Sequence, residues 1–248
     1  MNRLPISLLD PDPNSPFPSP ESALREPNGL LAAGGDLNPV RLLNAYRQGI
    51  FPWFSQGQPI LWWCPDPRMV FATQHVRLST KFRRALRHSD WTLRADTAFA
   101  QVIATCAKSP SRRHQGTWIT DGMIAAYTEL HRLGHAHSIE VFAGEDLVGG
   151  IYGVVIGRMF FGESMFSTES GGSKAALAGL AKLLHGWGWP LIDAQVESEH
   201  LRFLGAQSMP RPRFLAEIAS LTAAGGQPGP WTEFMPGIPV AELGEVPA

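Results

Sequence analysis

The amino-acid sequence predicts an α/β protein in which helices pack on a sheet. One observation is a run of three strands, "HSIEVFA", "LVGGIYGVVI" and "MFFGESMF", joined by the short turns "GED" and "GR" within residues 137–166. Such spacing predicts an antiparallel meander. Another is the helix that follows, in which apolar residues recur at helical spacing at Leu177, Leu180, Ala181 and Leu184. The last is "PLIDAQV", a buried strand after that helix.

The N-terminal part has a different character. Residues 1–27 contain seven prolines and are expected to be extended and partly mobile. A helix is predicted after them, with Asn38 as its N-cap, Pro39 at its first position and Gly49 at its end.

Three helices are predicted between this part and the meander. The stretch "STKFRRALRHSDW" is basic and amphipathic, with the densest basic cluster of the chain at Lys81, Arg83, Arg84 and Arg87. These side chains are expected either to contact RNA phosphates or to form a solvated helix face. A short helix capped by Asp96 follows, and a third begins at Thr120 or Asp121 and ends at Gly134.

Composition limits the class of protein. A formal net charge of −1 argues against a surface that is basic all over, although a local basic patch acts over only about 10 Å. Cys64 and Cys106 do not form a CxxC pair and are expected to be free thiols. No signal-peptide pattern and no run of about 18 apolar residues is seen, so a cytoplasmic location is expected.

A histidine cluster raises the question of a metal site. His131, His135 and His137 are close in sequence, but Gly134 interrupts the helix between the first two. No cysteine or carboxylate stands at ligand spacing beside them. Capping and packing roles are therefore favoured, and neither a metal nor a cofactor is predicted.

Polar residues inside apolar strands mark a candidate site. In "LIDAQV" the strand alternation places Asp193 and Gln195 on one face and Ala194 on the other. Buried polar groups need partners, so a structural hydrogen-bonded pair is one interpretation. Glu163 ends the preceding apolar strand. If the two strands are neighbours, these groups converge on a cleft suited to a substrate that carries an amine.

The loop between that strand and the helix allows two interpretations. "TESGGSK" is either a plain strand-to-helix turn or a cradle that binds an anion at the helix N-terminus, with Ser173 and Lys174 at its end. Trp53 and Trp118 are candidates for stacking on a nucleobase, although core packing would also explain either of them.

These residues together resemble a known family. The blocks "FPSPESALREPNGLLAAGGDL", "GIFPWF", "ILWWCPDPR", "GTWIT", "LHRLGHAHSIEV", "LVGGIYG", "FFGESMFS", "SKAAL" and "IDAQV…HLRFLGA" occur in order over residues 17–215. This succession is similar to the bacterial leucyl/phenylalanyl-tRNA–protein transferases. The resemblance implies a GNAT-like acyltransferase domain over residues 71–248, preceded by a small domain over residues 1–70.

The resemblance also implies the reaction and its partners. The family transfers leucine or phenylalanine from aminoacyl-tRNA to the N-terminal amino group of proteins that begin with arginine or lysine. The product is an N-degron, which marks the protein for degradation. A monomer without a cofactor is expected, and methionine is expected to be a poor donor because one methylene changes binding by only about 1–3 kcal/mol.

Site residues follow from the resemblance residue by residue. Asp193 and Gln195 match an Asp–x–Gln pair expected to activate the amine, and Glu163 matches the acid that places the acceptor. Family aromatics around the terminal adenosine and the aminoacyl group match Trp53 and Trp118. Further pocket walls are expected at Phe160, Met165 and Leu180. Two departures are Ala194, where the family usually has Cys, and the "TESGGSK" loop.

Two alternatives belong to different classes of protein. An acetyl-CoA-dependent GNAT acyltransferase would need a pyrophosphate loop, and "STESGGS" lacks the usual glycine pattern of that loop. A non-catalytic tRNA-binding module would bind leucyl-tRNA without turnover. A transfer assay with leucyl-tRNA and a peptide that begins with arginine separates these alternatives from the transferase.

Overall fold

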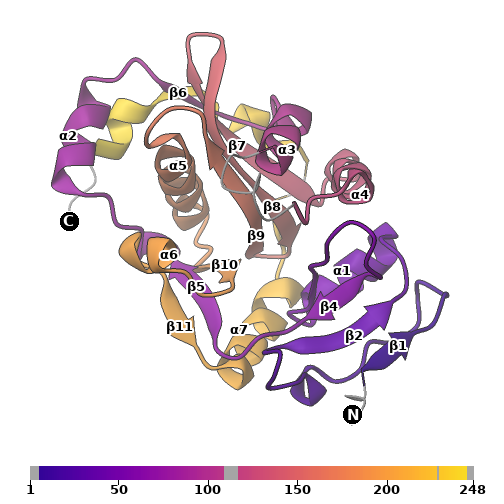
Figure 1. The fold of residues 1–248 in the computed structure, drawn as a ribbon. Coiled ribbons are helices and arrows are strands. Elements are labelled where there is room, and N and C mark those ends of the chain that lie inside the picture. Colours follow the sequence, from indigo (N-terminus) through magenta and orange to yellow (C-terminus); the bar gives the residue numbers. More distant parts are fainter. Residues whose placement is uncertain (1–5, 109–116, 228, 245–248) are drawn as a thin grey trace.

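The computed structural model describes residues 6–108, 117–227 and 229–244 and contains a small and a large sheet (Figure 1). The small sheet has the strand order β1-β2-β4-β3. Its strands are β1 (Ser7–Leu9), β2 (Leu30–Gly34), β3 (Phe51–Pro52) and β4 (Leu61–Trp63). Helix α1 (Pro39–Arg47) begins as predicted, because the Asn38 side chain accepts a hydrogen bond from the Val40 N–H.

The proline-rich start is more ordered than its composition suggests. Within the described residues 6–27, the chain forms β1 and a 3₁₀ turn, η1 (Pro20–Ser22). Phe17 is buried, and its ring meets that of Trp62 edge-on at 4.9 Å. The extended conformation expected here is found in β1, residues 1–5 lie outside the described part, and an aromatic residue among the prolines anchors the stretch to β4.

The large sheet has the strand order β11-β5-β10-β9-β8-β7-β6-β12. Its centre is the predicted antiparallel meander of β7 (Ala136–Ala143), β8 (Asp146–Ile156) and β9 (Met159–Ser167). On either side of it lie β5 (Arg68–Ala72), β6 (Thr92–Ala95), β10 (Leu191–Gln195), β11 (Gln207–Met209) and β12 (Pro236–Pro239). The predicted domain border at residue 70 falls inside β5, so the change of sheet lies in the turn over residues 64–67.

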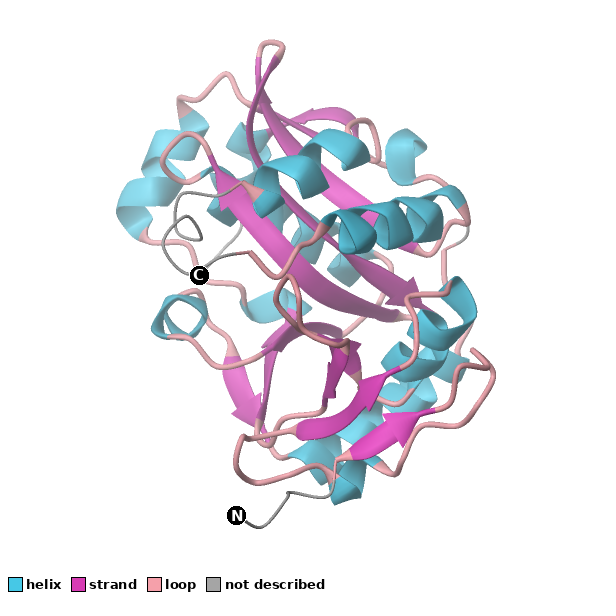
Figure 2. Ribbon diagram, turned by 45° about the vertical axis from the view of Figure 1, so that its right-hand side comes forward, coloured by secondary structure: helices cyan, strands magenta, loops and turns pink. Residues whose placement is uncertain are grey.

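Helices cover both faces of the large sheet (Figure 2). Alternate residues of β8 point to opposite faces: Tyr152 and Val154 pack with α3 (Phe99–Ala107) and α4 (Asp121–Arg132). Ile151 and Val155 pack instead with α5 (Gly172–Gly186). The remaining helices are α2 (Thr80–Arg87), α6 (Glu199–Phe203) and α7 (Arg211–Ala223), with 3₁₀ turns η2 (Thr73–His75), η4 (Trp231–Glu233) and η5 (Val240–Gly244). The α/β prediction is confirmed.

The pairing of β9 with β10 positions the candidate site. These strands are parallel because α5 connects them across one face of the sheet. Their register pairs Ile192 with Phe160 and Asp193 with Phe161 and extends no further along either strand. Beyond that point the two chains are no longer paired, so the residues that follow on each strand can line a cavity between them.

The predicted role of Asp96 as a helix cap is wrong. Asp96 does not cap the next helix: α3 begins at Phe99, and its N-cap, Ala98, offers no side-chain hydrogen bond. Asp96 instead adopts a positive φ of 58°, and its carboxylate accepts from the backbone N–H groups of Ser138 and Trp231.

Among the helices of the described residues, none combines the length and apolar character needed to cross a membrane.

Candidate functional site

A cavity of about 470 Å³ opens where β9 and β10 separate. We call it the central cavity. Much of its wall is apolar and comes from both parts of the chain: Phe51, Pro52, Trp53, Phe71, Trp118, Ile151, Met165, Leu177 and Ile192. Its polar lining includes Glu163, Ser164, Asp193, Gln195, Glu197 and His200. An apolar pocket with a few convergent polar groups is typical of a small-molecule or substrate site.

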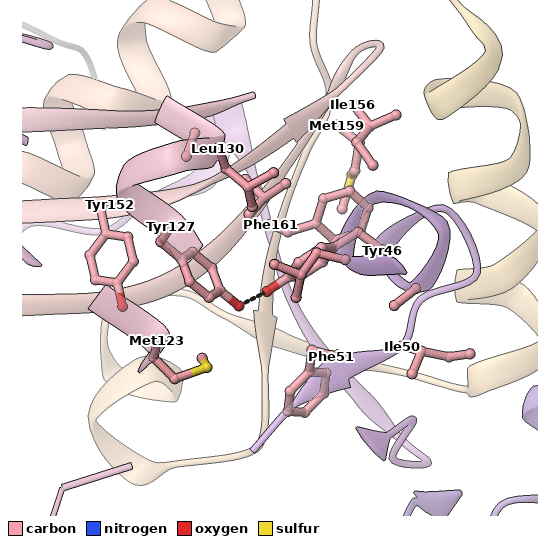
Figure 3. Packing of buried hydrophobic residues seen from close by; sticks show 14 of the residues in the cluster. Tyr46, Ile50, Phe51, Met123, Tyr127, Leu130, Tyr152, Ile156, Met159 and Phe161 are labelled. Carbon is pink, nitrogen blue, oxygen red and sulfur yellow. Dashed lines mark hydrogen bonds between the residues drawn. The ribbon is translucent and has the colours of Figure 1, made fainter. Parts of the chain in front are cut away.

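Glu163 is the centre of a buried hydrogen-bond network. Its Oε1 accepts from the Tyr46 hydroxyl at 2.6 Å and from Gln195 Nε2 at 2.7 Å. The Tyr46 hydroxyl is also hydrogen-bonded to that of Tyr127 (Figure 3). Residues of α1, α4, β9 and β10 are thus connected through the Glu163 carboxyl group. Because each partner comes from a different element, the fold fixes the orientation of the carboxyl plane.

The environment of Glu163 changes its acidity. Burial raises the pKa of this carboxyl to about 8, although hydrogen bonds from Tyr46, Tyr127 and Gln195 act in the opposite direction. Its second oxygen, Oε2, is buried and has no hydrogen-bond partner among the described residues. A carboxyl group in the wall of a cavity, with one oxygen held and the other unpartnered, can accept a hydrogen bond or a proton from a bound amine.

Asp193 is held by an arginine that sequence reasoning did not connect with it. Both carboxylate oxygens accept from Arg68, at 2.8 Å from Nε and 2.7 Å from Nη2, and both side chains are fully buried. Arg68 also donates to the Gly49 carbonyl, and its guanidinium lies 4.7 Å from the ring centres of Phe51 and Phe214. The charge of Asp193 is thus compensated within the fold, which favours a positioning role over proton transfer.

The expected alternation of Asp193, Ala194 and Gln195 is interrupted. The pairing register between β10 and β5 shifts between Asp193 and Gln195, and Gln195 has a positive φ of 61°. Asp193 Oδ1 stabilises this turn by accepting the Gln195 N–H at 2.9 Å. Ala194 consequently also lines the cavity instead of pointing away. Positive φ at a residue other than glycine is strained and is often found at functional sites.

The predicted aromatic and apolar walls are only partly found in the cavity. Trp53, Trp118 and Met165 line it, and the Trp53 side chain is 40 % exposed. Phe160 and Leu180 are wholly buried in the core beneath α5 and do not line it. They belong to the same core cluster as Leu177 and Ile192, which do line the cavity, so the difference is one of position along the elements: Phe160 lies where β9 and β10 are still paired, and Leu180 lies one turn beyond Leu177 on α5.

The glycine-rich loop before α5 is mainly a packing feature. A Cβ atom on Gly172 would lie 2.3 Å from the Val148 carbonyl oxygen, so only glycine allows this close approach to β8. Ser167 Oγ accepts from the Ser173 N–H, and the Gly172 N–H donates to the Glu169 carbonyl. These N–H groups are therefore occupied, which supports the strand-to-helix turn over the anion cradle. Neither Ser173 nor Lys174 lines the central cavity.

The predicted basic cluster lies on and beside α2. Lys81 and Arg84 are exposed, and Arg83 is half-buried. Arg87 donates twice to the Gly244 carbonyl and so holds η5 against the helix. Of the four residues, Lys81 and Arg84 are exposed, Arg83 is half-buried, and Arg87 is exposed but has a structural contact.

The histidine cluster has structural partners. His137 Nδ1 lies 2.7 Å from Asp96 Oδ2, and the imidazole stacks on Trp231 at 4.0 Å. Burial acts to raise the pKa of Asp96, but hydrogen bonds and charge from His137 and the backbone lower it overall. His131 stacks on Phe99. Within the part of the chain that the structure describes, no group of three or more His, Cys, Asp or Glu side chains could hold a metal ion.

Sequence reasoning missed three residues of this site. Tyr46 and Tyr127 stand at apolar positions of the helical pattern, where their hydroxyl groups give no separate signal. Arg68 did carry a signal: it begins the otherwise apolar strand "RMVFA", where a buried cation requires an anion nearby.

Comparisons with protein families give matches over most of the chain. A family described as "Leucyl/phenylalanyl-tRNA protein transferase" matches residues 70–219, and its N-terminal domain matches residues 35–66. The protein named leucyl/phenylalanyl-tRNA–protein transferase from Xanthomonas campestris pv. campestris (strain B100) is 66% identical over 233 residues, 94% of each chain. Its namesake from Xylella fastidiosa (strain M23) is 61% identical over 225 residues, 91% of this chain and 93% of that one.

Comparison with solved structures gives more remote matches. The crystal structure of FemX aligns with a TM-score of 0.47 and 11% sequence identity, over 70% of this chain and 67% of FemX. The two transferases from Xanthomonas and Xylella therefore match a larger part of this chain than FemX does.

Proposed function

Because this chain belongs to the leucyl/phenylalanyl-tRNA–protein transferase family, we propose that the central cavity is where it joins the aminoacyl group of its tRNA donor to an acceptor protein. The enzyme is an aminoacyltransferase that moves leucine or phenylalanine from aminoacyl-tRNA to protein. The observation that carries the placement is the unpartnered oxygen of Glu163 in the wall of an otherwise largely apolar cavity.

The apolar walls suit the donor. We assign the aminoacyl side chain to the region of Trp118, Met165 and Leu177, and the terminal adenosine to the exposed face of Trp53. Leucine and phenylalanine are both unbranched at Cβ, so a pocket fitted to them should exclude valine by shape. Methionine, which has similar length but fits less well, is a weak donor in this proposal.

The acidic lining suits an acceptor that begins with arginine or lysine. Such an acceptor brings an α-ammonium group and a cationic side chain. Glu163 faces the cavity, and Glu197 lies at its half-exposed edge, where Arg202 pairs with it at 2.7 Å. We assign the α-amine to Glu163 and the cationic side chain to the Glu197 edge. The product is an N-degron, which directs the modified protein to degradation.

The chemistry requires movement of two protons. The amine nitrogen attacks the ester carbonyl carbon, the C–N bond forms, and the bond to the ribose oxygen breaks. The amine attacks in its neutral form, so the α-ammonium first loses one proton to water. As the C–N bond forms, the nitrogen gives up a second proton, which we assign to the ionised form of Glu163, about a tenth of the enzyme at pH 7 because its pKa is about 8. Glu163 then returns this proton to the departing ribose oxygen. Gln195 and Tyr46 orient the carboxyl group through its other oxygen.

Donor and acceptor choice test this function directly. In single-turnover assays, leucyl- and phenylalanyl-tRNA should transfer to a peptide that begins with arginine, and methionyl-tRNA should transfer at least tenfold more slowly. Valyl-tRNA should be slower still. A peptide that begins with glutamate is the matched acceptor control. Equal rates for valyl- and leucyl-tRNA would show that the pocket is assigned wrongly, and binding of leucyl-tRNA without any transfer would favour a non-catalytic tRNA-binding module.

The exposed cations of α2 should contact the body of the tRNA. Replacing Lys81 and Arg84 together by alanine should weaken tRNA binding and reduce the slope of log K against log salt by about 0.7–0.9 per lost phosphate contact. Arg213→Ala, on an exposed face of α7, is the control for a general loss of positive charge. A salt slope equal to that of the unmodified enzyme would exclude these two residues from the RNA site.

Cell location and assembly belong to the same proposal. Its donor is a tRNA, so we place the enzyme in the cytoplasm, and we propose that it acts as a monomer because one chain supplies all the groups assigned above. The small N-terminal domain, which we end in the turn over residues 64–67, contributes Trp53 and Tyr46 to the site.

A further inference from the structure

A second large cavity lies on the other side of α6 from the central cavity. Its volume is about 1010 Å³. No aspartate or glutamate is found among the described residues that line it, whereas its basic lining consists of His75, Arg77, Arg83, Lys182, His185 and Arg202. Two of these cations are ion-paired with carboxylates that do not line the cavity, Lys182 with Glu242 at 3.0 Å and Arg202 with Glu197 at 2.7 Å. We call it the cationic cavity. Its charge is complementary to a polyanion and opposes an acceptor that begins with arginine or lysine.

The cationic and central cavities share walls. His200 and Leu201 of α6 line the central cavity, whereas Arg202 and Phe203, the next residues of that helix, line the cationic cavity. Helix α5 is shared in the same way, with Leu177 on the central side and Ala178 on the cationic side. A strand that leaves the central cavity past α6 therefore enters the cationic cavity directly.

Phe203 lies at this border in an unusual environment. Its side chain is 64% exposed, although it stands next to Leu204, which is wholly packed. The ammonium of Lys174 lies 6.0 Å from the Phe203 ring centre and 5.8 Å from that of Phe82. An exposed ring flanked by cations and bordering a cationic groove is the arrangement by which single-stranded nucleic acid is bound, with stacked bases and paired phosphates.

We propose that Phe203 stacks on a base of the unpaired tRNA 3′ end, upstream of the terminal adenosine, and that Lys174 and the cationic cavity hold the adjoining phosphates. This inference rests on the proposed function, which puts the terminal adenosine in the central cavity. It gives Phe203 a positioning role in donor binding, since the ring touches neither the ester nor the amine.

The test combines a protein change with an RNA change. Phe203→Ala should raise KM for leucyl-tRNA about tenfold and leave kcat within about twofold, since stacking of one base changes affinity by about 5- to 150-fold. Phe203→Trp should keep KM within about twofold. Abasic nucleotides are placed one at a time upstream of the terminal adenosine, and at one of these positions the unmodified enzyme should show a KM about tenfold higher than with intact tRNA. With that abasic tRNA, the KM of Phe203→Ala should be no higher than the KM of the unmodified enzyme. Leu8→Ala, which removes an exposed apolar side chain from β1, is the control.

Several results would overturn the inference. One is an unchanged KM for leucyl-tRNA in Phe203→Ala. Another is that the protein change and the removal of the base raise KM independently, so that their effects multiply. A third is a rise of KM for the acceptor protein instead of the tRNA. A fall of kcat and melting temperature without a change of KM would make Phe203 a structural residue. If the unmodified enzyme does not transfer leucine from intact leucyl-tRNA at all, the proposed function itself fails, which is a separate outcome.

Discussion

Asp193→Asn is expected to destabilise the protein by about 3–5 kcal/mol, because it leaves the buried guanidinium of Arg68 without its charged partner. For a chain of this size, that loss lowers the melting temperature by roughly 10 °C. Asp36→Asn is the matched control, since Asp36 pairs with Arg41 at 3.3 Å but is 39% exposed, and a change below about 1 kcal/mol is expected there. Thermal unfolding followed by circular dichroism measures both.

A double variant separates stability from chemistry. Arg68→Met combined with Asp193→Asn removes both buried charges, and the asparagine Oδ1 can still accept the Gln195 N–H. We expect this variant to recover at least half of the lost stability and to transfer leucine within about tenfold of the unmodified enzyme. If Asp193→Asn instead keeps the original melting temperature and loses transfer by 10²-fold or more, the charge of Asp193 acts in the reaction and not only in the fold.

The sequence predicted the elements well because their signals are local. Asn38, Gly49 and Thr120 begin or end helices through contacts within a few residues, and the meander follows from strand alternation and tight turns. Asp96 was interpreted wrongly for the complementary reason. Its carboxylate binds the backbone of residues far along the chain, and no local pattern reports such partners.

The sequence predicted which residues form the candidate site better than it predicted how they are arranged. The two strands were expected to bring Glu163, Asp193 and Gln195 to one cleft if they were neighbours, and all three residues line the central cavity. The sequence did not predict that a bidentate arginine compensates Asp193, because that pair joins strands 125 residues apart in sequence. Phe160 and Leu180 lie on the cavity side of the sheet but deeper in the core, away from the point where β9 and β10 separate, and a periodic pattern alone cannot decide that depth.

Glu163→Gln is expected to lower the single-turnover rate of transfer about 10²-fold above pH 9, where Glu163 is ionised, and about tenfold at pH 7, because the amide cannot accept a proton from the attacking nitrogen. The shape of the side chain and its contacts with Tyr46 and Gln195 are largely kept. Stability provides the control. Since the pKa of Glu163 is raised to about 8 in the folded protein, its contribution is complete below about pH 4.5 and is lost as pH rises through 8. The variant should therefore be at least as stable as the unmodified enzyme above pH 8.

The central claim, that Glu163 accepts the proton of the attacking amine, is tested most directly by the ratio of these two transfer rates as a function of pH. Single-turnover transfer from saturating leucyl-tRNA to a peptide that begins with arginine is measured for the unmodified enzyme and Glu163→Gln from pH 7 to pH 9.5. A ratio of about tenfold is expected at pH 7, where about a tenth of Glu163 is ionised, rising to about 10² at pH 9.5, where nearly all of it is ionised. A ratio near unity across the range, or one that falls as pH rises, would contradict this role of Glu163.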